Sequence, residues 1–96
     1  MKEKQLYVYI VTNILKTVLY TGVTSNFKQR VYQHKEGMLP GFTKRYKTTR
    51  LVYYEVAQNA YSAITREKQL KSGSRQDKLD LIKEFNPAWD DLYYCI

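Results

Sequence analysis

Three short runs of β-branched and aromatic residues constrain this chain most strongly. Each run is too short for a typical helix and has the composition of a buried strand. The first two are separated by a short turn region, residues 13–17, and therefore predict a β-hairpin in which Gly22 marks a close backbone approach or a bulge. The expected strands are Leu6–Thr12, Val18–Thr24 and Arg50–Val56.

Helix signals occupy three further segments. The first, FKQRVYQH, follows two residues that favour helix N-caps and contains no helix breaker. Asn59 and Ser74 are placed to cap two later helices, which Gly73 and then Asn86-Pro87 terminate. The expected helices are Phe27–His34, Ala60 to about Ser72 and Arg75 to about Phe85.

The order of these elements, ββαβαα, predicts one α+β domain over residues 1–96. A chain of this length is enough for one core, and it contains no repeat, low-complexity segment or linker. The segment Gly37–Lys47 has two glycines and a proline and is expected to be a substrate-facing loop. Residues 88–96 are expected to form a tail that packs back through Trp89, Leu92 and Tyr93.

The net charge of +7 is concentrated in the middle of the chain. Between positions 28 and 50 many basic residues are opposed by a single acid, Glu36, and Tyr32, Phe42 and Tyr46 are interleaved with them. Such a segment suits a nucleic-acid backbone, although a solubilising surface has the same composition. The residues expected to contact nucleic acid are Lys28, Lys35, Lys44, Arg45 and Lys47.

Two other classes of protein are disfavoured. The single cysteine, Cys95, has no second Cys or His at metal-ligand spacing, so a zinc site is not expected. The N-terminal residues MKEKQ lead into a short apolar run, which is neither a signal peptide nor a membrane span, so a cytoplasmic location is expected.

Polar residues interrupt the apolar stripes of two predicted helices. Arg30 and His34 follow the core-facing spacing on the first helix, and Glu67 does so on the second. Arg30 could clamp a phosphate, because its guanidinium is always charged and binds oxygens in pairs, or its stem could pack with the head in solvent. For Glu67 three interpretations are open: an edge position in water, an ion pair with Arg30, or a ligand for Mg²⁺.

The predicted hairpin presents three tyrosines out of the ten in the chain. Tyr7 and Tyr9 alternate along the first strand and so share one face of the sheet, and Tyr20 stands two residues before Gly22 on the next strand. Each is either a core residue with a tethered hydroxyl or a group that acts near a phosphate or a bound water.

The ordered set of these motifs resembles the GIY-YIG nuclease superfamily. The resemblance is carried by YVYI, then LYTG, then FKQR and a later REKQL, and it spans the chain from Tyr7 to about Leu92. More narrowly, the chain resembles small standalone bacterial proteins of that superfamily that are related to the N-terminal endonuclease domain of UvrC. The resemblance implies a three-stranded antiparallel sheet flanked by helices.

The resemblance also implies residue roles. Tyr9 and Tyr20 are the two motif tyrosines, Arg30 contacts the scissile phosphate, and His34 belongs to the hydrogen-bond network of the site. Glu67 matches the single acidic ligand of one Mg²⁺ or Mn²⁺ ion. The implied activity is metal-dependent hydrolysis of DNA phosphodiester bonds, in repair or recombination, with RNA as another substrate to consider.

The chain departs from the family pattern at several positions. The first motif has Tyr7 and Val8 in place of glycine and isoleucine, and the second has Thr21 in its middle. Val23 stands where some members have a lysine, and Asn86 matches a family asparagine only loosely in spacing.

Several assignments stay open from the sequence. Either motif tyrosine could activate the nucleophile, and His34 could accept a proton or orient a tyrosine. Two other functions also remain: a non-catalytic DNA- or RNA-binding module with a basic, tyrosine-rich surface, and a structural protein in which Arg30 and Glu67 form a buried pair.

Overall fold

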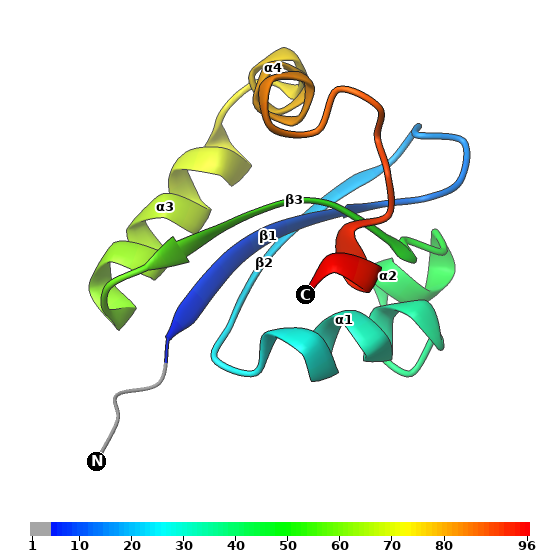
Figure 1. The fold of residues 1–96 in the computed structure, drawn as a ribbon, viewed down its shortest axis with the longest axis horizontal. Coiled ribbons are helices and arrows are strands. Elements are labelled where there is room, and N and C mark those ends of the chain that lie inside the picture. Colours follow the sequence, from blue (N-terminus) through cyan, green and yellow to red (C-terminus); the bar gives the residue numbers. More distant parts are fainter. Residues whose placement is uncertain (1–4) are drawn as a thin grey trace.

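The computed structural model describes residues 5–96 and contains a three-stranded antiparallel sheet with helices on both faces (Figure 1). The expected α+β fold is therefore confirmed, with two short helical elements added, one in the segment 37–47 and one in the C-terminal tail. The segment 37–47, expected to be a loop, includes the single helical turn α2. The elements are β1 (Leu6–Thr12), β2 (Leu19–Thr24), α1 (Phe27–Lys35), α2 (Phe42–Arg45), β3 (Arg50–Ala57), α3 (Ala60–Ser72), α4 (Arg75–Phe85) and the 3₁₀ helix η1 (Leu92–Cys95).

The strand order is β2-β1-β3, so the first strand of the chain is the central one. Tyr9 on β1 pairs with Gly22 on β2, and the Tyr9 ring covers this glycine. A Cβ atom on Gly22 would lie 2.4 Å from the Tyr9 hydroxyl oxygen, which is closer than any side chain can accommodate without a shift. The close approach expected at Gly22 is thus the approach of a tyrosine ring.

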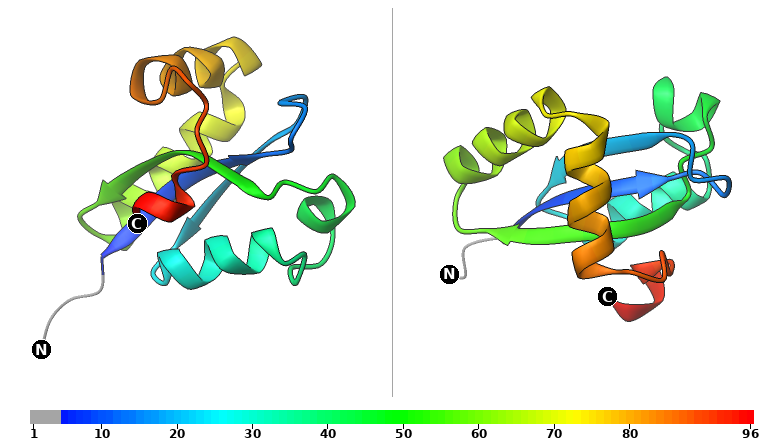
Figure 2. Two further views of the ribbon diagram at one scale, coloured as in Figure 1. Left: turned by 45° about the vertical axis from the view of Figure 1, so that its right-hand side comes forward. Right: turned by 90° about the horizontal axis from the view of Figure 1, so that it is seen from above.

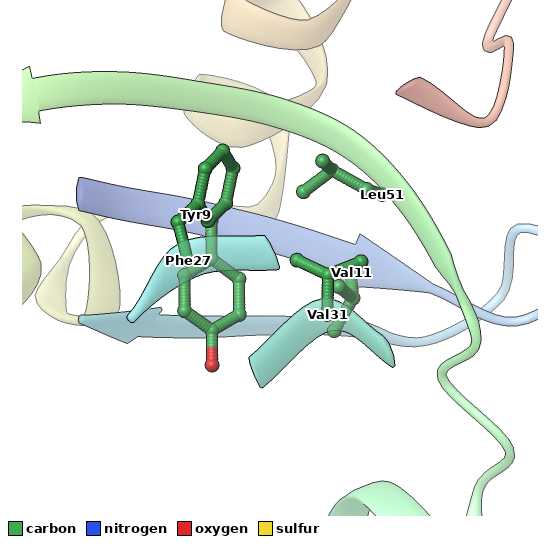
Figure 3. Packing of buried hydrophobic residues seen from close by; sticks show 5 residues of the cluster. All are labelled: Tyr9, Val11, Phe27, Val31 and Leu51. Carbon is green, nitrogen blue, oxygen red and sulfur yellow. The ribbon is translucent and has the colours of Figure 1, made fainter. Parts of the chain in front are cut away.

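One face of the sheet packs against α1 and η1. Its buried cluster consists of Tyr9, Val11, Phe27, Val31 and Leu51, which Figure 3 shows gathered between the sheet and α1. Partly buried residues complete this face, and several of them are aromatic: Tyr7, Tyr20, Tyr54, Leu92, Tyr93 and Ile96. The predicted shared face of Tyr7 and Tyr9 is therefore confirmed.

The opposite face packs against α3 and α4, and α4 runs across the strands (Figure 2, right). Its buried side chains are mostly aliphatic: Val8, Ile10, Val52, Tyr53, Ala63, Leu70 and Ile82. A register shift between Ile10 and Val11 accompanies the unusual placement of Val52 and Tyr53, which are adjacent in sequence yet join the same cluster.

Local hydrogen bonds explain where α3 and α4 begin. The Asn59 side chain accepts from the backbone N–H of Ser62, and Ser74 and Asp77 form a reciprocal capping box. Asn26 occupies the N-cap position of α1 without a side-chain cap bond, so packing of Phe27 and Val31 stabilises that helix instead. Among residues 5–96, no helix combines the length and apolarity that a membrane span requires.

Candidate active site

A pocket of about 250 Å³ lies between the sheet, α1 and α2. It brings together four of the side chains that the sequence singled out, from three different elements. The pocket is lined by Tyr9, Tyr20, Arg30, His34, Leu39, Pro40, Phe42 and Thr43.

The Tyr9 hydroxyl and the His34 Nε2 atom form a buried hydrogen bond of 2.9 Å between β1 and α1. Burial is the main reason why the pKa of Tyr9 lies well above its ordinary value, and negative charge on Tyr20 and Glu67 adds to this, whereas the Arg30 guanidinium opposes it. With 1% of its surface exposed, Tyr9 is a neutral, fixed group at physiological pH.

His34 is also buried, and its ring carries one unused hydrogen-bonding atom. Burial, assisted by the positive charge of Arg30, lowers the pKa of His34 from 6.5 to about 4, so the imidazole is neutral at pH 7. Its Nδ1 atom is buried without a hydrogen-bond partner in the described part of the chain. The ring can therefore take one further hydrogen bond from a water or a ligand.

Tyr20 is the more accessible of the two motif tyrosines. It is half-buried on β2, and its ring lies 5.7 Å from the His34 ring and 5.9 Å from the Phe42 ring. The Lys71 ammonium lies 5.8 Å from the centre of the Tyr20 ring. Tyr20 therefore lines the pocket next to an imidazole and near a cation.

Arg30 is half-buried on α1 and lines two cavities. The second cavity, of about 300 Å³, lies beside the end of β2 and is also lined by Ala63 and Ile64 of α3. None of the three ion pairs among the described residues includes Arg30. Its guanidinium is thus available to an anion, and the sequence-based alternative of an Arg30–Glu67 ion pair is wrong.

Glu67 projects from α3, and 19% of its side chain is exposed. It does not line the pocket that contains Tyr9 and His34. Its carboxylate is paired with Lys71 one helical turn later, at 3.5 Å between Oε2 and Nζ. Because the same ammonium lies over Tyr20, Lys71 connects the carboxylate to the pocket.

Comparison with known proteins identifies the family of this chain. A family model for the GIY-YIG catalytic domain matches residues 5–80. The chain belongs to the GIY-YIG family. The resemblance found in the sequence is therefore confirmed.

Relatives of similar size support the assignment. A UPF0213 protein from Staphylococcus haemolyticus is 40% identical over 78 residues, covering 81% of this chain and 94% of that protein. A UPF0213 protein from Syntrophus aciditrophicus is 40% identical over 82 residues, covering 84% and 92%. The solution NMR structure of a UPF0213 protein from Bacillus halodurans is 25% identical, with a TM-score of 0.58 over 91% of this chain and 92% of that chain. This GIY-YIG protein thus resembles small standalone members of its family.

The basic residues expected to bind nucleic acid fall into two groups in the GIY-YIG structure. Lys28, Lys44, Arg45 and Lys47 are exposed, and none of them forms an ion pair with another described residue. Lys35 differs, because its ammonium pairs with Asp91 and donates to the carbonyl of Thr49 at 3.1 Å. Lys35 therefore ties the C-terminal segment to α1 and β3.

Two residues of this GIY-YIG family member acquire their roles only in three dimensions. Lys71 was not predicted to be a site residue, although its spacing of four residues from Glu67 is the signal for a helical ion pair. Asn86 donates to the carbonyls of Val52 and Asp90 and accepts from the Asp90 N–H, so its amide holds the end of α4 to β3 and the tail.

Proposed function

We propose that the protein, acting as one domain over residues 1–96, is a metal-dependent endonuclease that hydrolyses DNA phosphodiester bonds. GIY-YIG membership implies the nuclease class. The observation that carries the proposal for this chain is the shared pocket of Tyr9, Tyr20, Arg30 and His34. A guanidinium without a carboxylate partner, beside two phenols and a neutral imidazole, is suited to a phosphodiester and to proton transfer.

Arg30 is assigned to the scissile phosphate. Its charge would stabilise the additional negative charge that develops on the phosphate oxygens in the transition state. The two cavities that it lines give a phosphate access to the guanidinium from the side of α1 and from the side of α3.

Tyr20 is assigned to the activation of the attacking water, and Tyr9 to support. Tyr9 is buried, its pKa is raised, and its hydroxyl is already bonded to His34. Tyr20 is only half-buried and lines the pocket, so its hydroxyl is the more accessible of the two to an attacking water. His34 would fix the Tyr9 ring through their hydrogen bond.

Among the described residues, Glu67 is the carboxylate that the family resemblance assigns to a catalytic metal ion. The described residues contain no group of three or more His, Cys, Asp or Glu side chains that could form a metal site by themselves. Glu67 with its partly exposed carboxylate fits Mg²⁺ or Mn²⁺, which take few protein ligands and complete their shells with water and phosphate oxygens. When bound, such an ion would neutralise charge on the leaving oxygen.

Nicking of supercoiled plasmid tests the proposal. Wild-type protein should nick the plasmid in Mg²⁺ or Mn²⁺ and lose this activity in EDTA. Glu67→Ala and Arg30→Ala should each lower the rate by at least roughly 100-fold. Glu84→Ala, which removes an exposed carboxylate from α4, is the matched control and should keep the wild-type rate.

Two outcomes would change the proposal. Equal rates for wild type and a folded Glu67→Ala variant would remove this carboxylate from the mechanism. DNA binding without cleavage of plasmid, gapped or branched DNA by wild type would favour the non-catalytic binding module. We also propose that the protein is cytoplasmic, acts in DNA repair and is closely related to UvrC. The plasmid assay does not test these three points.

A further inference from the structure

A row of aromatic rings leads out of the pocket along α2. The Tyr20 and Phe42 rings are stacked at 5.9 Å with an angle of 29° between their planes. The Phe42 and Tyr46 rings follow at 4.6 Å and 46°. Phe42 is 46% exposed and Tyr46 is 40% exposed, and neither belongs to a core cluster. The two outer rings of the row are therefore more exposed than the half-buried Tyr20.

The helical turn α2 is held in place by its backbone and by buried threonines, whereas its aromatic rings are partly exposed to solvent. Gly41 at φ 81° precedes α2 and Lys47 at φ 54° follows it, so the chain reverses sharply on both sides. Thr43 and Thr48 are buried beneath the turn, and the backbone N–H of Thr48 donates to the Thr43 carbonyl at 3.2 Å. Packing of these threonines therefore helps to anchor α2 while its rings stay partly exposed.

The exposed rings alternate with cations. Lys44, Arg45 and Lys47 are exposed and take part in no ion pair with another described residue, and the Arg45 guanidinium lies 5.5 Å from the Tyr46 ring centre. Aromatic faces supply stacking surfaces for bases, and neighbouring cations supply partners for phosphates. An apolar protein partner would not account for the charges, whereas a polynucleotide strand accounts for both features.

The row also joins two cavities. The pocket of about 250 Å³ is lined by Phe42 and Thr43. A larger groove of about 570 Å³ is lined by Thr43, Tyr46 and the exposed hairpin residues Ile14 and Leu15. Thr43 and His34 line both cavities, so the pocket and the groove adjoin each other beside α2.

We propose that Phe42 and Tyr46 form a base-stacking platform and that the substrate is DNA with unpaired bases next to the scissile phosphate. This inference rests on the proposed nuclease function and specifies its substrate. In duplex DNA the faces of the bases are stacked on one another, so the rings of α2 can reach only bases that have left the stack. Gaps, flaps, single-stranded ends and the locally unwound segments of negatively supercoiled plasmid contain such bases.

Binding to a single-stranded DNA oligonucleotide in EDTA tests the platform without cleavage. The comparison is with an oligonucleotide of equal length whose central nucleotides are abasic, since both carry the same phosphates. Wild type should bind the abasic strand roughly 5- to 100-fold more weakly. Phe42→Leu/Tyr46→Leu should bind both strands equally, at the weaker affinity. Tyr61→Leu, which removes an 81% exposed tyrosine from α3, should behave as wild type.

The outcomes separate this inference from the function on which it rests. Equal wild-type affinity for both strands, absence of binding, or an unaltered double variant would overturn the platform. If plasmid is still nicked with dependence on Glu67, the nuclease assignment stands without it. Base-dependent binding that the double variant loses, with no cleavage of any DNA, would support the platform and overturn the nuclease assignment.

Discussion

The two faces of the sheet bury different chemistry. The face against α3 and α4 is largely aliphatic, with Val8, Ile10 and Ile82 fully buried. The face against α1 buries Tyr9 and His34, which are joined by a hydrogen bond and flanked by the half-buried Arg30. Burying polar groups contributes less to stability than burying aliphatic ones, because desolvation offsets much of the gain. Both faces thus bury aliphatic side chains, and the face against α1, the polar face, adds the candidate site to its own buried Val11, Val31 and Leu51.

The largest change in stability is expected on the aliphatic face. Ile82→Ala would remove a fully buried side chain of α4 and leave a cavity, so we expect a loss of about 2–5 kcal/mol in the free energy of unfolding. Urea unfolding at pH 7 measures this loss. The fraction of protein that remains folded should nick DNA at the wild-type rate, and a selective loss of nicking would contradict the division between the faces.

The polar face should be the one that responds to pH. His34 binds its proton at a pKa of about 4 when folded and near 6.5 when unfolded. The unfolded chain therefore binds more protons between these values, and stability falls as the pH drops from about 6.5 to about 4, by roughly 3 kcal/mol in total.

Substitution of His34 isolates this contribution. His34→Gln keeps a hydrogen-bonding side chain near Tyr9 but cannot titrate, so the variant should lose less stability than wild type between pH 6.5 and 4. Urea unfolding of both proteins across this range provides the comparison. Parallel curves would show that His34 is not the group responsible.

Gly22 sharpens the comparison, because it lies beneath the Tyr9 ring on the polar face. The added Cβ of Gly22→Ala would displace this ring, with an expected loss of about 1–3 kcal/mol at pH 7. The Tyr9–His34 hydrogen bond should weaken with it, so nicking activity should fall more than the folded fraction does. A variant with full activity and wild-type stability would mean that the Tyr9 ring can adopt another position without loss.

The smallest expected effects on stability and DNA affinity distinguish the structural residue Lys35 from the exposed lysines that are proposed to bind DNA. Lys35→Met would remove the contacts to Asp91 and the Thr49 carbonyl, lowering stability by about 1–2 kcal/mol. Its effect on DNA affinity should be small, whereas Lys44→Met should weaken DNA binding and leave stability nearly unchanged. Anisotropy titrations with DNA and urea unfolding of both variants measure these effects, and the reverse result would contradict the assignment.

The elements of this protein could be predicted from its sequence because their signals are local. The strand runs, the caps at Asn59 and Ser74 and the polar interruptions at Arg30 and His34 each depend on residues a few positions apart. The helical turn of α2 was missed, because glycines and a proline in its segment indicate a loop and a single turn has little periodicity.

By itself, the sequence determined the order of elements, the family motifs and the candidates for chemistry. Only the tertiary structure decided which candidates meet. Tyr9 reaches His34 across 25 residues, Lys35 is paired with Asp91, and Glu67 is paired with Lys71 and not with Arg30. The physical reason is that strand register and helix packing fix these distances, and both arise from the cooperative burial of the two faces. No local propensity encodes them.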